Sequence, residues 1–264
     1  MADLNRILDQ VIAACRDVGR EEVMPRYLKV AHQRKVDGSL LTEADVAAQN
    51  ALCRRLQAIA PYPVLGEEMT EAEQRAVWDL GEEAFWCVDP IDGTSNFVNG
   101  LPYFAISVAL IRDRKSVLGV VYDPAADEAF YAIAGQGAFL DGERLPIKAA
   151  PTELRRCMAG IELKRIDREL AGRLAFEHPF SSQRNLGAST LDWCYLAAGR
   201  LHVYLHGGQK LWDYAAGCLI LREAGGAVCA LDGGDFRAVD PWNRSVLAAL
   251  TPELLSQWRA WVGV

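Results

Sequence analysis

Two aspartates lie three residues apart where an apolar run ends. The run over 84–88 is typical of a strand that proline stops after Asp89, and Asp92 follows within a Pro-Ile-Asp-Gly turn. Two carboxylates this close repel each other unless a cation lies between them, and Mg²⁺ prefers oxygen ligands of this kind. Gly93 and Thr94 then open a predicted helix whose free backbone N–H groups can hold an anion. The segment therefore predicts phosphate chemistry, although an Asp-Gly turn alone needs no ligand.

The complete string over 89–97, Asp-Pro-Ile-Asp-Gly-Thr-Ser-Asn-Phe, resembles the D-P-x-D-G-T-x-N-F signature of the inositol monophosphatase family, the Mg²⁺-dependent, lithium-sensitive phosphatases. Two further segments resemble elements of this family. Glu67, in Gly-Glu-Glu, matches a metal ligand that helps to hold the attacking water, with Glu68 as a supporting neighbour; alone, a Glu pair is usually just solvated. Asp213, in Trp-Asp-Tyr-Ala-Ala-Gly, matches the metal-ligating Asp of a W-D-x-A-A-G motif; alone, it could equally be a helix cap.

The resemblance implies a centre of two or three Mg²⁺ ions. Asp89 would bridge two ions, and Glu67 with the Ile91 carbonyl would complete the first of them. Asp92 and Asp213 would complete the second, and a third would be held loosely through Glu67 and waters. Such ions lower the pKa of a bound water and stabilise the leaving alkoxide.

The same resemblance implies which groups assist the reaction. Thr94, oriented by a hydrogen bond to Asp45, would deprotonate the attacking water together with Glu67. Thr42 and Asp45 also fit a capping box at the start of a helix, so two roles for Asp45 conflict. We favour the family role because Lys35 also lies where a family lysine precedes this aspartate.

Substrate contacts are also implied, and one position departs from the family. The inositol-contacting Glu, seven residues before Asp213, is His206 here, which accepts one hydrogen bond when neutral and none when charged. A charged His206 would favour a second phosphate or another anion. Ser189 falls where animal enzymes have a small residue near the ring, though it could equally cap a helix; Arg184 and Lys210 are basic neighbours or plain surface charge. The implied substrate-binding residues are Asp92, Gly93, Thr94, Ser189, His206 and Asp213, with the amides of Gly93 and Thr94 holding phosphate oxygens.

Three functions fit these residues. The first is a Mg²⁺-dependent phosphomonoesterase that hydrolyses inositol monophosphate by attack of a metal-activated water. The second is a phosphatase for fructose 1,6-bisphosphate or adenosine 3′,5′-bisphosphate. The third, from another class, is a non-catalytic regulatory binding protein on the same fold; the intact carboxylates argue against it, because like charges held close together are costly. The expected partner is a small-molecule phosphate ester, and the family resemblance implies a homodimer.

The composition is that of an ordinary globular protein. With 264 residues, 51% hydrophobic and 24% charged, the chain can bury a large core. A net charge of −7 without a Lys/Arg block argues against nucleic acid as a partner. The longest apolar run, over 104–111, is too short to span a bilayer. The seven cysteines contain no Cys-x-x-Cys pair and indicate free thiols, so we expect a cytoplasmic protein without a membrane segment.

The order of predicted elements indicates two halves. After two amphipathic helices, short consecutive strands with tight turns indicate an antiparallel sheet in an α+β half over 1–150, which carries most metal ligands. Helices and strands alternate in an α/β half over 151–264, which carries Asp213 and substrate-contacting residues. The family resemblance implies a layered αβαβα sandwich, with a mixed or mostly parallel sheet in the second half and the active site between the halves. The second predicted helix begins near 42, later helices cover 189–198, 214–224 and the segment after 251, and strands cover 103–111, 117–122, 128–133, 201–205, 227–231 and 246–250.

Overall fold

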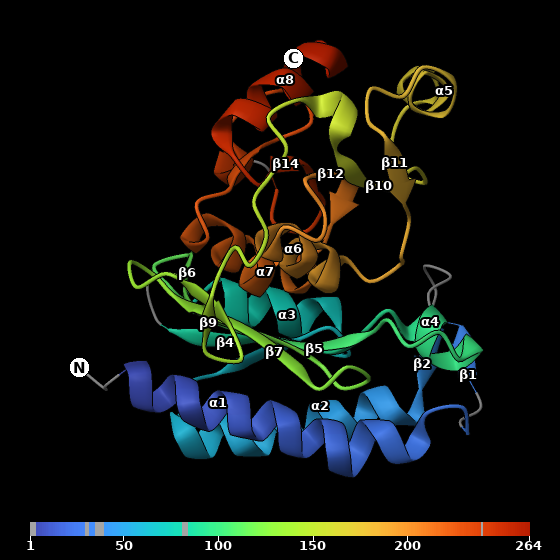
Figure 1. The fold of residues 1–264 in the computed structure, drawn as a ribbon. Helices are drawn as coiled ribbons and strands as arrows, with labels where there is room; N and C mark the ends of the chain where they lie inside the picture. Colours follow the sequence, from blue (N-terminus) through green and yellow to red (C-terminus); the bar gives the residue numbers. More distant parts are fainter. Residues whose placement is uncertain (1–3, 30–31, 35–39, 81–83, 239) are drawn as a thin grey trace.

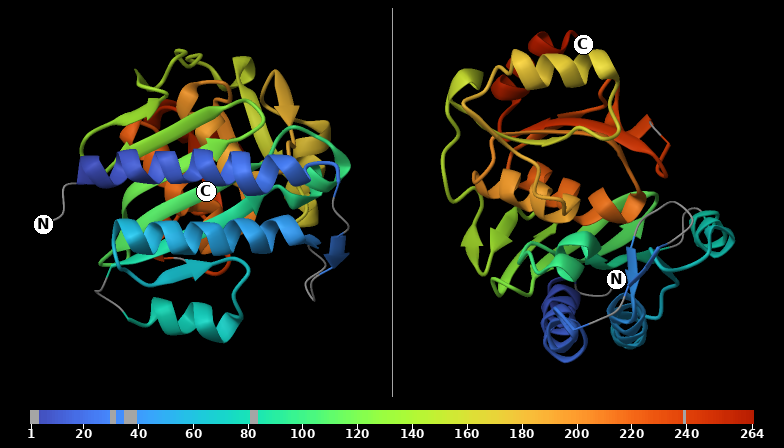
Figure 2. Two further views of the ribbon diagram at one scale, coloured as in Figure 1. Left: turned by 90° about the horizontal axis from the view of Figure 1, so that it is seen from below. Right: turned by 90° about the vertical axis from the view of Figure 1, so that its right-hand side faces the viewer.

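Five layers, alternately helical and sheet, make up the protein (Figure 1). Helices α1 and α2 cover one face of a seven-stranded sheet, and α6 and α7 lie between that sheet and a five-stranded one. Helices α5 and α8 cover the far face of the five-stranded sheet (Figures 1 and 2). The layered αβαβα sandwich predicted from the sequence is confirmed. The computed structural model describes residues 4–29, 32–34, 40–80, 84–238 and 240–264.

The described elements have the following bounds. The α-helices are α1 (Leu4–Val18), α2 (Glu43–Ile59), α3 (Glu71–Trp78), α4 (Thr94–Asn99), α5 (Arg168–Phe176), α6 (Ser189–Ala198), α7 (Leu211–Glu223) and α8 (Pro252–Val262). A π-helical turn is η1 (Gly19–Val23), and 3-10 turns are η2 (Met24–Arg26), η3 (Leu154–Arg156) and η4 (Phe236–Ala238). The strands are β1 (His32–Arg34), β2 (Leu40–Thr42), β3 (Val64–Gly66), β4 (Phe85–Asp92), β5 (Ala105–Arg112), β6 (Lys115–Asp123), β7 (Glu128–Ile133), β8 (Ala138–Leu140), β9 (Glu143–Arg144), β10 (Met158–Glu162), β11 (Ser182–Arg184), β12 (Val203–Gln209), β13 (Ala227–Cys229) and β14 (Arg244–Ala249).

The two sheets differ in strand direction. The first runs β3-β4-β5-β6-β7-β8-β9 and is antiparallel except for one parallel pair, β3 with β4, which the sequence did not indicate. The second runs β11-β10-β12-β14-β13 and is mixed, with β10 parallel to both neighbours and β14 antiparallel to both of its own. The parallel pair matters for the site, because it brings the ends of β3 and β4 to the same edge of the sheet.

Strand β4 does not stop at Asp89 as predicted but continues through a bulge to Asp92. Asp89 pairs with Ser107 and Asp92 with Ala105, so three steps along β4 match two along β5. Pro90 offers no N–H to the ladder, which suits it to an irregular position. Residues three apart point to opposite faces of a regular strand, and one extra residue reverses this. The bulge therefore brings the side chains of both aspartates to the same face of the sheet.

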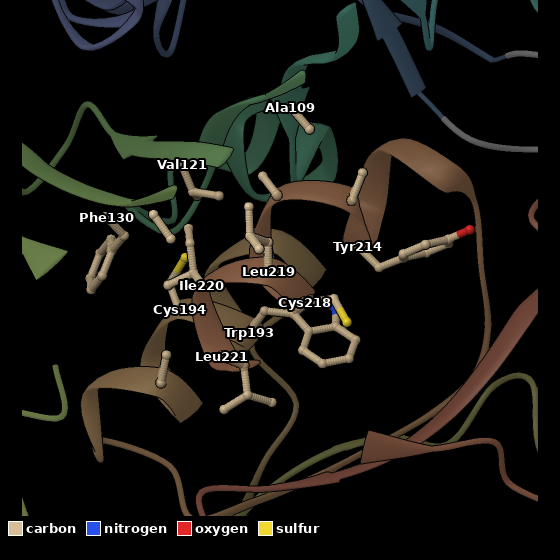
Figure 3. Close-up of a cluster of buried hydrophobic side chains, with 14 of the residues drawn as sticks. Ala109, Val121, Phe130, Trp193, Cys194, Tyr214, Cys218, Leu219, Ile220 and Leu221 are labelled. Atoms are coloured by element: carbon tan, nitrogen blue, oxygen red, sulfur yellow. The ribbon is translucent and has the colours of Figure 1, made fainter. Parts of the chain in front are cut away.

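Apolar cores fill the space between the layers. Alternate residues of the first sheet point to opposite faces, so Val108 packs under α1 and α2 while Ala109 packs against α7. Figure 3 shows Val121 of the sheet close to Leu219 and Ile220 of α7 in the central core. Since that core contains residues of both sheets, α6 and α7 join the two halves. Within the described part of the chain, no helix is both long and apolar enough to cross a membrane.

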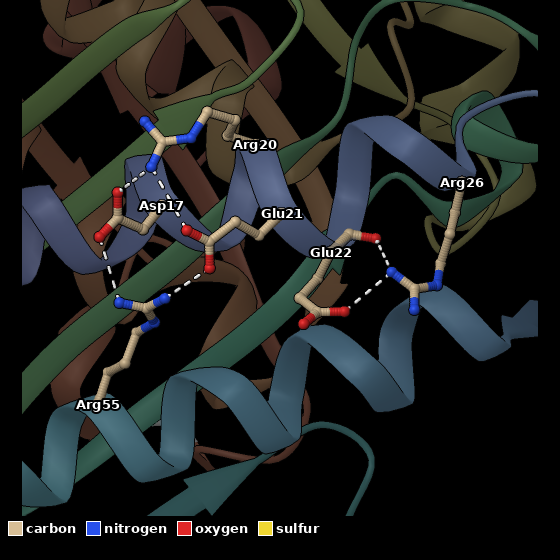
Figure 4. Close-up of polar contacts among 6 residues, drawn as sticks. All are labelled: Asp17, Arg20, Glu21, Glu22, Arg26 and Arg55. Atoms are coloured by element: carbon tan, nitrogen blue, oxygen red, sulfur yellow. Dashed lines mark hydrogen bonds and ion pairs between the residues drawn. The ribbon is translucent and has the colours of Figure 1, made fainter.

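Ion pairs join the outer helical layer at its surface (Figure 4). Arg55 of α2 donates to Asp17 at 3.2 Å and to Glu21 at 2.7 Å, and Arg20 also contacts Asp17 at 2.7 Å. These side chains are partly exposed, and exposed pairs contribute little each. The network therefore orients α1 against α2 more than it stabilises the fold, and it lies on the face of the first sheet opposite the candidate site.

Two helices were missed from the sequence, for the same reason. Helices α3 and α5 are short and bury few side chains, so they carry little apolar periodicity. Their start signals are clear in the structure, because Thr70 caps α3 in a capping box with Glu73, and Asp167 caps α5. The predicted start of the last helix, with Thr251 as its cap and Pro252 first, is confirmed.

Candidate active site

A cavity of about 810 Å³ lies between the two halves of the chain. The signature segment and the end of β3 form one side, and α6, β12 and the start of α7 form the other. All but one of the residues predicted for the site line this cavity, and the exception, Asp45, lies beneath Thr94. The predicted residues at the cavity are Glu67, Asp89, Ile91, Asp92, Gly93, Thr94, Ser189, His206 and Asp213.

Three aspartates converge in this cavity. Asp89, Asp92 and Asp213 each bring a carboxylate oxygen to within 4.8 Å of the other two. Asp92 is fixed by α6, because the backbone N–H and the hydroxyl of Thr190 donate to its Oδ2 at 2.6 and 2.7 Å. Such a set of hard oxygen donors fits a divalent cation such as Mg²⁺. The sequence predicted these three ligands, but nothing in it indicated Thr190.

Asp213 lies in the first turn of α7, although it is not the N-cap that its segment alone would suggest. The N-cap is Lys210, whose backbone N–H donates to Asp213 Oδ2 at 2.8 Å. Asp213 is thus the third residue of the helix and reaches back to its start. Its other oxygen is left for the cavity.

Burial and crowding raise the pKa values of all three aspartates. Burial, followed by the charges of Glu67 and Asp92, raises the pKa of Asp89 well above its usual range. Burial raises the pKa of Asp92 to about 6, although the Thr190 hydrogen bonds oppose the shift. Burial and the charge of Asp92 raise the pKa of Asp213 to about 8. The site therefore holds its full negative charge at neutral pH only when a cation compensates it.

We expect Mg²⁺ affinity to rise with pH up to about 8. A ligand carboxylate must be deprotonated, so the apparent Kd should fall by roughly tenfold per pH unit while Asp213 alone is titrating. A raised pKa also means that metal-free stability is lost as pH rises through the folded-state value, so the melting temperature without metal should fall toward pH 8. Calorimetric Mg²⁺ titration and thermal unfolding at pH 6, 7, 8 and 9 measure both, and an equal Kd at pH 6 and 8 contradicts the prediction.

Glu67 enters the site from the end of β3. Its backbone N–H donates to the Val88 carbonyl at 3.1 Å, which continues the parallel pairing with β4. The side-chain amide of Gln74, on α3, donates to the Glu67 carbonyl at 3.1 Å and so fixes the backbone of Glu67. The neighbouring Glu68 donates its backbone N–H to Gln49 Oε1 at 3.0 Å. Glu67 acts electrostatically on all three aspartates, which agrees with a ligand position.

Asp45 fills both roles that the sequence set against each other. Its Oδ2 accepts from the backbone N–H and hydroxyl of Thr42, at 2.7 and 2.6 Å, and this closes the capping box of α2. Its Oδ1 accepts from the Thr94 hydroxyl at 3.4 Å. The two roles are compatible because the carboxylate has two oxygens. The Thr94 hydroxyl also lies 3.0 Å from the Ile91 carbonyl oxygen, and Lys35, invoked for this region, lies outside the described residues.

The turn between β4 and α4 requires glycine. Gly93 has a φ of +86°, and a Cβ there would approach Ala188 to 2.9 Å and the Tyr103 carbonyl to 3.0 Å. Asn96 fastens the same turn, because its amide donates to Tyr103 O at 2.8 Å and to Leu186 O at 2.7 Å. The asparagine of the signature therefore joins the two halves of the chain, a function that its position in the sequence did not show.

Ser189 and His206 lie on the substrate side of the cavity. Ser189 is the first residue of α6 and not its cap, which is Ala188, so the capping alternative is wrong. His206 is buried on β12, and its Nδ1 accepts from the Gly208 N–H at 3.1 Å. Burial and the charges of Arg165 and Lys164 lower the pKa of His206 to about 3. The anion-attracting charged His206 considered from the sequence is therefore wrong: the ring is neutral, and its other nitrogen is a donor.

Two basic residues that the sequence reasoning missed, Lys164 and Arg165, act electrostatically on His206. Lys164, Arg165 and Lys210 all line the cavity, whereas Arg184 does not, and it bonds to Ser182 and Gln183. Arg165 donates to the Gly208 carbonyl at 2.7 Å. No spacing rule links the loop of Lys164 and Arg165 to the signature, so only the fold shows that this loop lines the same cavity as the converging aspartates.

The residues present fit a Mg²⁺ centre. The atoms available to bind a metal are carboxylate oxygens whose negative charges lie close together. No described histidine or cysteine joins the converging group. Asp89, Asp92, Asp213 and Glu67 are the residues that could hold the ions, and the Ile91 carbonyl faces the same cavity.

Comparisons with known proteins agree with this geometry. A family model described as the inositol monophosphatase family matches residues 3–260. The inositol-1-monophosphatase of Mesorhizobium japonicum is 36% identical over 239 residues, covering 88% of this chain and 86% of that protein. The Nus factor SuhB of Pasteurella multocida is 33% identical over 243 residues, covering 88% and 87%. The crystal structure of the extragenic suppressor protein suhB from Bartonella henselae has a TM-score of 0.82 at 28% identity, covering 97% of this chain and 98% of that one.

A layered sandwich with converging carboxylates in the cavity between its halves defines a class of metal-dependent phosphatases. The chain belongs to the inositol monophosphatase family. Its relatives carry names of two kinds, inositol-1-monophosphatase and Nus factor. Membership of the family therefore indicates phosphatase chemistry but does not identify the substrate.

Proposed function

We propose that the protein is a Mg²⁺-dependent phosphomonoesterase that hydrolyses inositol monophosphate. The observation that carries the proposal is the group of three aspartates with oxygens within 4.8 Å, in one cavity with Glu67 and Thr94. Two or three Mg²⁺ ions there would lower the pKa of the attacking water and stabilise the leaving oxygen. The printed name of the Mesorhizobium relative supports inositol 1-phosphate as the first substrate to test.

The residues of the chain supply position and a route for the proton. If the Thr94 hydroxyl passes its own proton to Asp45 Oδ1, 3.4 Å away, the Thr94 oxygen can take the proton of the attacking water. Gly93 and Thr94 begin α4, where backbone N–H groups can hold the phosphate oxygens. Asp213 and His206 face the rest of the substrate, the former as an acceptor and the latter as a donor. In phosphoryl transfer, positioning of the reacting groups and stabilisation of charge account for most of the catalytic contribution of the protein.

A bisphosphate is the second candidate, and Arg165 favours it. A Cβ at Gly207 would lie 1.8 Å from the Arg165 carbonyl oxygen, so this glycine lets the Arg165 loop lie directly on β12. The charge of Arg165 lowers the pKa values of both His206 and Asp213, so its guanidinium lies near both side chains. A fixed cation that lines the same cavity as the aspartates suits a second anionic group on the substrate.

The testing experiment is phosphate release with and without Mg²⁺ from inositol 1-phosphate, fructose 1,6-bisphosphate and adenosine 3′,5′-bisphosphate, compared as kcat/KM. Preference for inositol 1-phosphate supports the lead proposal, and preference for a bisphosphate supports the second. Absence of Mg²⁺-dependent release from all three contradicts both and favours the non-catalytic binding protein.

Arg165→Gln should separate the two substrate classes. We expect kcat/KM for whichever bisphosphate is hydrolysed to fall by roughly tenfold, because one charge-assisted contact is lost, and that for inositol 1-phosphate to change by less than about twofold. Arg184→Gln is the matched control, since that exposed arginine does not line the cavity. An equal loss on all substrates would mean that Arg165 acts on the shared phosphate or on the fold.

A further inference from the structure

A second cavity, of about 510 Å³, lies on another side of α7. Its walls are the outer face of α7, the turn between β5 and β6, the end of α3 and the η4 segment. None of the described residues that line it also lines the candidate active site. Its volume falls within the usual range for small-molecule sites. Neither the catalytic proposal nor any sequence motif accounts for it.

The floor of this second cavity is aromatic. Tyr214 and Phe236 pack edge to face with ring centroids 5.3 Å apart, and Trp78 forms the opposite wall. Leu211 and Leu219 of α7 complete the apolar surface. The parts of these rings that line the cavity offer apolar contact to a planar ligand.

The rim of the same cavity is basic, in a protein whose net charge is −7. The Arg114 guanidinium lies 4.5 Å from the centre of the Trp78 ring, and that of Arg244 lies 4.7 and 4.9 Å from the Tyr214 and Phe236 rings. Stacking on the Trp78 ring leaves the N–H groups at the edges of the Arg114 guanidinium able to point elsewhere. The basic residues at this cavity are Arg114, Lys115, Arg222, Arg237 and Arg244, against the acidic Asp113 and Asp240.

Arg222 is a basic residue of this cavity whose contacts within the described ranges are incomplete. The Nε of Arg222 is buried and finds no hydrogen-bond partner among the described residues. Neither Arg114 nor Arg222 forms an ion pair within 4.0 Å in the described part of the chain. Arg222 lines the cavity without an ion pair to any described residue, so its charge favours an anionic acceptor there.

We propose that this second cavity binds a small aromatic molecule carrying one anionic group. The rings of Trp78, Tyr214 and Phe236 would hold the aromatic part, and Arg222 with Arg244 would hold the carboxylate, sulfonate or phosphate. The proposal is independent of the catalytic one, because Asp213 and the other carboxylates face the first cavity. The two cavities are separated by α7 and by the edge-to-face contact of Trp78 with Trp242, whose ring centroids lie 6.0 Å apart.

Naphthalene-2-sulfonate is a suitable probe, with 2-naphthalenemethanol and 2-naphthylmethylammonium as the neutral and cationic comparisons. Isothermal titration should show one site with a submillimolar Kd for the sulfonate, and binding weaker by roughly tenfold or more for the other two. Saturating Mg²⁺ with inorganic phosphate should leave that Kd unchanged. Displacement by Mg²⁺ and phosphate would place the probe in the first cavity and overturn the proposal, as would equal affinity for the neutral compound.

Two variants test the location of the bound probe. Arg222→Met should weaken sulfonate binding by roughly tenfold through the lost charge-assisted contact. Ser116→Trp should abolish binding by filling the cavity from β6, and it serves if Arg222→Met fails to fold. Arg184→Met is the matched control, because that arginine lines neither cavity. Wild-type affinity in a folded Ser116→Trp protein, or the same loss in Arg184→Met, would overturn the assignment.

Discussion

Asp92→Asn is expected to reduce Mg²⁺-dependent turnover by about 10³-fold and to make the metal-free protein more stable at pH 8. Activity falls because a carboxylate is removed from the group that could hold the ions. The packing survives, since the amide oxygen of asparagine can accept both Thr190 hydrogen bonds, at the 2.6 and 2.7 Å observed for Asp92. The new NH₂ group then faces Asp89 and Asp213. It donates hydrogen bonds to these carboxylates, where the Asp92 carboxylate repelled them.

The stability gain has a defined pH dependence. Burial raises the pKa of Asp92 to about 6, so the cost of its charge is absent below the unfolded-state pKa of about 4 and fully present above pH 6. We expect the melting temperature of Asp92→Asn to exceed that of the wild type by about 2–4 °C at pH 8, the shift that roughly 1 kcal/mol produces in a chain of this size. The gain should shrink as pH falls and vanish only below the unfolded-state pKa of an aspartate, about 4. Mg²⁺ should no longer raise the melting temperature.

Thermal unfolding with and without Mg²⁺, together with a phosphate-release assay, measures both effects of Asp92→Asn. Asp9→Asn is the control for the chemical change, because Asp9 is exposed on α1, far from the cavity. Retained turnover in Asp92→Asn would sink the assignment of the metal ligands. A melting temperature that falls at pH 8 would show that Asp92 stabilises the fold and is not held there under strain.

The residues proposed as metal ligands could be named from the sequence because they lie in short local motifs. Asp89 and Asp92 are three residues apart in the sequence, and the bulge in β4 brings their carboxylates to the same side. Glu67 and Asp213 came from resemblance to a family, and the structure places both at the same cavity as the signature. Sequence reasoning still misplaced the end of β4, because a bulge is a property of the pairing with β5 and not of the strand alone.

The groups that position these ligands could not be predicted, because they come from distant parts of the chain. Thr190 approaches Asp92 only when α6 packs across the first sheet, and Arg165 reaches the cavity only because Gly207 lets its loop lie on β12. The charge of His206 depends in turn on Arg165 and on burial. The hydrogen bonds of Arg165 and Thr190 join residues that are 43 and 98 positions apart in the chain. Contacts of this kind leave no periodic pattern that a single sequence could reveal.

Asp45→Asn should lower kcat by about 10²–10³-fold while the fold and Mg²⁺ affinity are kept. The amide has one acceptor oxygen in place of two, and this oxygen must face Thr42, whose backbone N–H cannot accept a hydrogen bond. The NH₂ group of the asparagine then faces the Thr94 hydroxyl, which lies 3.4 Å from Oδ1 in the wild type. Thr94 becomes an acceptor from residue 45 and directs its own proton to the Ile91 carbonyl, 3.0 Å away. The lone pair proposed to take the proton of the attacking water is thereby occupied.

The capping box of α3 provides a matched control for the Asp45→Asn change. Glu73 accepts from the backbone N–H and hydroxyl of Thr70 at 2.8 and 2.6 Å, in the same arrangement as Asp45 with Thr42, but it has no contact with the site. Glu73→Gln therefore measures what an amide costs a capping box alone, and kcat should be unchanged in it. If Asp45→Asn keeps kcat within about threefold of the wild type, the hydrogen bond to Thr94 takes no part in proton removal, and Asp45 serves α2 only. A low kcat with wild-type melting temperature and Mg²⁺ affinity would assign Asp45 to the route of the proton, since a purely structural residue would alter the melting temperature as well.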